Sequence, residues 1–133
     1  MESFETLFYA RLSILIFITI LFLQSGLDKV FNFSGNKSYI KSVFEKTFLS
    51  SIDGLLFVSI TILEVVTGIV ALTGSIQMCF NQKEELALIA LLLSSASLLS
   101  LFAGQRISKD YGGASAIVPY FIVIILGLYL FSF

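Results

Sequence analysis

The chain has 133 residues, of which 57% are hydrophobic and 13% are charged, and its formal net charge is −1. This composition is too apolar for a soluble globular domain. Because phosphate binding needs a basic face, the charge balance excludes nucleic acid as a partner. The chain has no histidine and a single cysteine, Cys79, which excludes an intramolecular disulfide, a bis-histidine haem, a thiol–imidazole metal site and a paired-cysteine oxidoreductase.

Four apolar runs are long enough to cross a bilayer, which takes a helix of about 20 residues. They predict helices over residues 7–28, 52–74, 86–104 and 115–133. Short connections between successive helices favour antiparallel neighbours. The expected fold is therefore all-α, an integral membrane four-helix bundle of up-down topology that forms one domain over residues 1–133.

The segment between the first two runs has its own apolar stripe. Tyr39, Val43, Phe44 and Phe48 share one helical face, and lysines lie opposite. This pattern predicts a short amphipathic helix in the headgroup region, with its aromatic side chains toward the acyl chains. A solvated loop with scattered aromatic residues is the alternative.

The basic residues are divided unequally between the two faces of this predicted bundle. One face, formed by the first and third connections, carries Lys29, Lys37, Lys41, Lys46, Arg106 and Lys109, and the other carries Arg11 and Lys83. Because cytoplasmic loops are enriched in lysine and arginine, the first and third connections are expected in the cytoplasm and both termini in the periplasm.

Small residues follow one face of the third predicted helix and predict close helix packing. They are Ala87, Ala90, Ser94, Ser97 and Gly104. A contact with a ligand is the alternative role for the two serines. In the fourth predicted helix, Pro119 is expected within the first turns, where backbone N–H groups have no partner inside the helix.

Glu64 lies near the middle of the second apolar run. An ionisable group at this depth costs about 2.5–3.5 kcal/mol, so it either stays protonated or pairs with a cation. On ideal helices Arg11 lies about 9 Å nearer the outer face, which makes a buried Arg11–Glu64 pair feasible. Two roles remain open for Glu64: a structural tie between helices, and a proton or ligand site.

The polar segment Gly104–Ala114 separates the last two apolar runs. It brings together Arg106, Lys109, Asp110 and Tyr111, in a turn that Gly112 and Gly113 are expected to keep tight.

Gln24 and the pair Asp28–Lys29 should lie level with this segment at the end of the first helix. Asp28 is expected to pair with Arg106 or Lys109 as a structural tie. The cluster would then form a polar cap for the head of an amphipathic molecule whose tail lies between the helices. Interfacial charges that reach toward water are the alternative.

As a set, these motifs resemble the DoxX family of small four-helix bacterial membrane proteins, and within it the subgroup of Bacteroidetes-type bacteria. The first helix ends in Ser25-Gly26-Leu27-Asp28-Lys29, similar to the family's Gly-x-x-Lys ending. The second helix has Glu64, Gly68, Leu72 and Gly74 in series. The segment 104–114 leads into Pro119-Tyr120.

The resemblance implies an accessory or quinone- or lipid-binding subunit of a redox or respiratory complex in the bacterial inner membrane. It implies a quinone or a lipid as the ligand and no covalent cofactor. The partners that it implies are other membrane subunits or a second copy of the chain. Because the chain has no redox-active pair of its own, it is not expected to be an enzyme by itself. The alternatives are a purely structural or assembly subunit and a small proton-coupled transporter, although no inverted repeat is visible.

Overall fold

The computed structural model describes residues 2–133, with side chains from residue 5 onward, and the regular structure of this part of the chain is entirely helical. The elements are α1 (Glu2–Phe31), α2 (Phe33–Phe44), the short 3₁₀ helix η1 (Ser50–Ile52), α3 (Asp53–Asn81), α4 (Glu85–Ile107) and α5 (Tyr111–Leu130). The predicted all-α class is confirmed.

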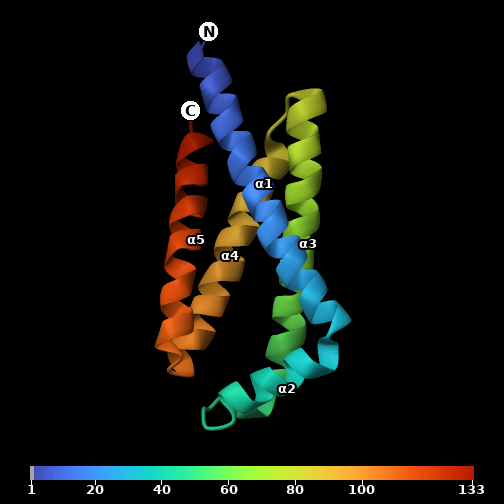
Figure 1. Cartoon of the computed structure of the whole chain (residues 1–133), viewed down its shortest axis with the longest axis vertical. Helices are drawn as coiled ribbons and strands as arrows, with labels where there is room; N and C mark the ends of the chain where they lie inside the picture. The colour runs from blue at the N-terminus through green and yellow to red at the C-terminus, as the bar shows by residue number, and fades with distance from the viewer. Residues whose placement is uncertain (1) are drawn as a thin grey trace.

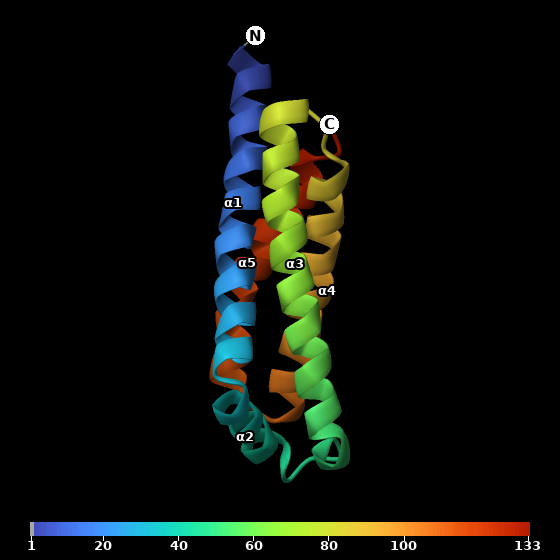
Figure 2. The same cartoon turned by 90° about the vertical axis from the view of Figure 1, so that its right-hand side faces the viewer.

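The long helices α1, α3, α4 and α5 lie side by side and run alternately in opposite directions (Figures 1 and 2). Along the chain, α1 packs on α3, α3 on α4 and α4 on α5, while α1 also touches α4 and α5. Both termini lie at one end of the molecule, and α2 lies across the other end (Figure 1). We call the second end the α2 end.

Four helices, α1, α3, α4 and α5, are long and apolar enough to cross a membrane. Their outer surfaces expose large aliphatic side chains such as Ile62, Leu92 and Ile122, whereas Ala90 and Ser94 are fully buried. An interior of small residues with an aliphatic exterior is the arrangement expected of helices in lipid. The chain is therefore a multi-pass membrane protein.

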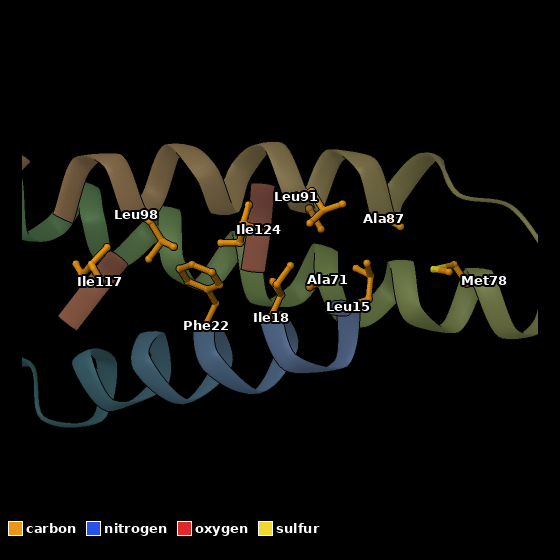
Figure 3. Close-up of a cluster of buried hydrophobic side chains, with 11 residues drawn as sticks. Leu15, Ile18, Phe22, Ala71, Met78, Ala87, Leu91, Leu98, Ile117 and Ile124 are labelled. Carbon is orange, nitrogen blue, oxygen red and sulfur yellow. The ribbon is translucent and has the colours of Figure 1, made fainter. Parts of the chain in front are cut away.

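The core forms where α1 faces the other long helices. Leu15, Ile18 and Phe22 of α1 are spaced to share one helical face, and all are buried. They lie against Ala71 of α3, Leu91 and Leu98 of α4 and Ile117 and Ile124 of α5 in the buried cluster (Figure 3). Side chains of all four long helices therefore meet in one buried cluster.

The small-residue face of α4 packs as predicted at four of its five positions, whereas Gly104 is only partly buried. Ala87, Ala90, Ser94 and Ser97 are fully buried. The hydroxyls of Ser94 and Ser97 donate to the carbonyl oxygens of Ala90 and Leu93 one turn earlier, at 2.7 and 2.9 Å. A polar contact to α3 also forms, because Ser97 Oγ lies 3.2 Å from Thr67 Oγ1. The packing role of these serines is therefore confirmed.

Glycines allow α1 and α3 to approach closely. A Cβ on Gly68 would lie 2.9 Å from the backbone nitrogen of Leu23, and one on Gly26 would lie 3.0 Å from that of Val65. Because backbone atoms cannot move aside as a flexible side chain can, both positions require glycine at this separation.

Helix α3 is longer than predicted. The expected end near Gly74 is wrong, because the helix continues to Asn81 and ends at Gln82, whose φ of 56° is left-handed. Gly74 serves packing instead, since a Cβ there would lie 2.9 Å from the backbone nitrogen of Ala87 in α4.

The segment Gly104–Ala114 is mostly helical. Gly112 and Gly113 lie in the first turn of α5, and neither has a positive φ, so the predicted glycine turn is wrong. Lys109 instead turns the chain, with φ of 64°. Asp110 then begins α5, because its carboxylate Oδ1 accepts the backbone N–H of Gly113 at 3.0 Å.

Two further expectations need correction. Pro119 lies about two turns inside α5 rather than in its first turns. A proline at this position leaves the carbonyl of Ser115 without its helical donor, which membrane helices tolerate. Phe48 lies beyond α2, which ends at Phe44, and its side chain is exposed.

The close approach of α1 and α3 gives a first prediction. We expect Gly68→Ala to lower the free energy of unfolding by about 1–3 kcal/mol, because the added methyl group pushes against the Leu23 backbone. Gly112→Ala is the matched control, since a Cβ there meets nothing within 4 Å. Thermal unfolding in detergent followed by circular dichroism measures both. Equal stability of the two variants would contradict the proposed contact.

Candidate functional site

Glu64 of α3 is completely buried and is held by two side chains of α1. Its Oε2 atom accepts a hydrogen bond from Ser25 Oγ and lies 3.1 Å from Lys29 Nζ. Lys29 Nζ also donates to Ser25 Oγ at 2.9 Å. The Oε1 atom has no hydrogen-bond partner among the described residues. We call Ser25, Lys29 and Glu64 the Glu64 cluster.

The local sequence explains this geometry. Ser25 and Lys29 are four residues apart and therefore lie on the same face of α1. Gly26 lies between them and lets this face approach α3, while the Lys29 side chain is only 17% exposed. The ammonium group thus reaches inward from the α2 end along its own apolar stem.

The predicted Arg11–Glu64 pair does not form, because Arg11 pairs with Glu84 at 2.8 Å. Arg11 precedes Ser25 by fourteen residues, which is about 21 Å along a helix. The extension of α3 to Asn81 instead brings the α3–α4 connection to the level of Arg11.

Arg11 connects three parts of the chain at the end opposite α2. Its Nε and Nη2 atoms donate to the carbonyl oxygen of Leu130 at 3.0 and 2.8 Å, and Nη1 donates to Glu84. The guanidinium carbon lies 5.2 Å from the centre of the Phe131 ring. A cation that donates to the last carbonyls of α5 satisfies acceptors that the helix leaves unpaired.

The residues predicted to form a polar cap are divided among separate interactions. Arg106 stacks on the ring of Tyr111, 4.5 Å from its centre, and Asp110 caps α5. Gln24 and Asp28 are exposed, and among the described side chains Asp28 forms no ion pair with Arg106 or Lys109. The predicted tie through Asp28 is therefore absent from this part of the chain, whereas Lys29 does tie α1 to α3.

A pocket of about 390 Å³ lies between α2, α3 and α4 at the α2 end. Its lining comprises Tyr39, Ile40, Val43, Phe44, Leu49, Leu56, Phe57, Ser59, Ile60, Leu63, Ser100, Leu101, Ala103, Gly104, Gln105, Ile107, Ser108 and Asp110. The lining does not include Glu64 or Arg106. The structure thus separates the Glu64 cluster from the pocket, although the sequence left open a single site shared by both.

The polarity of this pocket changes along its length. Leu63 and Leu101 lie toward the middle of their helices, whereas Gln105, Ser108 and Asp110 lie at the α2 end. The Oε1 atom of Gln105 is buried and has no hydrogen-bond partner among the described residues. An unpaired buried acceptor costs about 1–3 kcal/mol, and this atom is closed off from the open space of the pocket.

Sequence reasoning missed most of this pocket. Leu56, Ser59, Ile60 and Leu63 have the spacing of one helical face, but residues 54–63 are mostly apolar on every face, and nothing distinguishes this face from its neighbours. The position of α2 across the ends of α3 and α4 closes the pocket, and no local pattern encodes that position.

Comparisons with models of protein families, with curated proteins and with solved structures find no match for this chain.

The Glu64 cluster gives a second prediction. We expect Lys29→Met to lower the free energy of unfolding by about 3–5 kcal/mol, because it leaves the buried carboxylate without its cation. The double variant Lys29→Met/Glu64→Leu should recover most of this loss. Unfolding in detergent measures both, with Lys41→Met at an exposed lysine of the same end as the control. A double variant as unstable as the single variant would contradict the role of the pair.

The contacts of Arg11 give a third prediction. We expect Arg11→Lys to raise amide hydrogen exchange in the last turn of α5 about tenfold or more, because a lysine cannot reproduce the forked donor geometry. Exchange measured by mass spectrometry over residues 127–133 tests this. Arg106→Lys, at the opposite end of the molecule, is the control and should leave this segment unchanged.

Proposed function

We propose that this chain is a DoxX-like membrane protein that binds the head and the upper tail of a membrane amphiphile between α2, α3 and α4. The pocket of about 390 Å³ carries this proposal. Its volume is within the range of about 300–1,000 Å³ that is typical of small-molecule sites. A mostly apolar lining whose amide and carboxylate, Gln105 and Asp110, lie at one end suits a molecule with an apolar tail and a polar head.

The proposed orientation places the α2 end in the cytoplasm and both termini in the periplasm of a bacterium. All lysines and arginines except Arg11 and Lys83 lie at or near the α2 end. Such an excess of cations favours the cytoplasmic side of the inner membrane. In this orientation α2 lies at the level of the headgroups, with Val43 and Phe44 toward the helices and Lys37 and Lys41 exposed.

The amphiphile classes that we propose are quinones and lipids. Both have an apolar tail, and the hydroxyl groups of a quinol or of a lipid glycerol would donate to the Asp110 carboxylate, which belongs to the pocket lining. The polar groups in the pocket lining are hydroxyls, one amide and one carboxylate, and they include no thiol or amine nucleophile. We therefore propose a binding or accessory role in a larger membrane redox assembly rather than catalysis by this chain alone.

A pocket-filling variant tests the proposal. Ser59 lines the pocket, and Ser59→Phe is expected to remove the retained amphiphile because the ring occupies the space of the tail. Native mass spectrometry of protein gently extracted from its own membrane should show a bound small molecule in the wild type and at least about tenfold less in the variant.

The matched control is Ser115→Phe, which adds the same ring at an exposed position of α5 outside the pocket. Equal retention by the two variants would contradict the proposed site. Larger subunits that co-purify with a ligand-free wild-type protein would instead indicate a structural or assembly role.

A further inference from the structure

A second hollow adjoins the pocket on its outer side. It has a volume of about 740 Å³ and lies between the end of α2, the loop that follows α2 and the α4–α5 connection. Val43, Ile107 and Ser108 line both the pocket and the hollow. The pocket and the hollow are therefore neighbours at the α2 end.

The hollow is basic. Lys46 and Lys109 line it from opposite sides, one from the loop after α2 and the other from the α4–α5 connection. Neither lysine forms an ion pair with any side chain that the structure describes. Glu45 is the one acidic residue of the lining, so two cations face one anion in the hollow, while Asp110 lines the adjoining pocket.

We infer that the ligand is an anionic phospholipid, with its phosphate in the hollow between Lys46 and Lys109 and one acyl chain in the pocket. This inference rests on the proposed function, because it specifies the ligand of the same pocket. Lysine ammonium groups bind phosphate as point charges and are attracted to anionic headgroups at a membrane surface. A quinone head is neutral, so its carbonyl oxygens would gain less from these two cations than a phosphate does.

The position of the hollow supports a lipid as the source of the phosphate. Phe48 lies in the lining beside Lys46 and is 79% exposed, as expected of an aromatic side chain that inserts at the boundary of the headgroups and acyl chains. From Leu56 to Leu63 the pocket follows about 10 Å of α3 toward the membrane interior. The basic hollow thus lies toward the membrane surface and the apolar pocket toward the membrane interior, as the head and the acyl chains of a phospholipid do in one leaflet.

The test compares lipids that share acyl chains and differ in head charge. Protein in detergent is titrated with phosphatidylglycerol or with phosphatidylcholine, and native mass spectrometry counts the bound molecules. The wild type should prefer phosphatidylglycerol, and Lys46→Gln/Lys109→Gln should reduce that preference about tenfold. The matched control is Lys37→Gln/Lys41→Gln, which removes the same charge from the same end outside the hollow and should keep the preference.

Two outcomes overturn the inference while the proposed pocket stands. In the first, both double variants lose the preference equally, which would indicate a general surface charge. In the second, the wild type binds phosphatidylcholine or a neutral quinone as tightly as phosphatidylglycerol. If either result is found and Ser59→Phe also loses all binding, the pocket still binds an amphiphile. It then does not select an anionic head.

A different outcome overturns the proposed function itself. If Ser59→Phe binds every lipid as the wild type does, then no tail occupies the pocket, and the inference fails with it. Circular dichroism and gel filtration of each variant establish that a loss of binding does not reflect unfolding.

Discussion

The contact between α1 and α3 is the constraint on which the rest of the structure depends. In lipid no hydrophobic force draws apolar helices together, so association relies on close packing and on polar contacts. Gly26 and Gly68 provide the close packing, and the Glu64 cluster provides the polar contact beside them. A charged pair withdrawn from water favours one register of the two helices, because any shift would leave a buried carboxylate without a cation.

Two charge clusters hold the opposite ends of the helices and leave the binding surface to other residues. Arg11 joins α1 to Glu84 and to the Leu130 carbonyl at the end of α5, while Glu64 joins α3 to α1 nearer the α2 end. The pocket lies nearer the α2 end, against α2 and α4, and its lining includes no residue of either cluster.

Short-range chemistry at the α2 end shapes the proposed site. The left-handed backbone at Lys109 and the cap from Asp110 make the α4–α5 connection so short that Gln105, Ser108 and Lys109 stay close to α2. Helix α2 then covers the pocket with Val43 and Phe44. The result is an apolar pocket whose outer rim is polar and basic, at the level where headgroups lie in the proposed orientation.

Composition and periodicity by themselves determined the all-α class, the four membrane-spanning helices, the helix between the first two and the packing face of α4, since hydrophobic length and small-residue spacing are local properties. Composition also identified Glu64, because an ionisable residue in the middle of a long apolar run is recognisable from the sequence. Only the tertiary structure decided that its partners are Ser25 and Lys29 rather than Arg11, and that Gly74 packs instead of ending α3. The side chains that Glu64 contacts depend on how far each helix extends and how the helices cross. The pocket depends on where α2 lies. These are relations between distant segments, which no local pattern records.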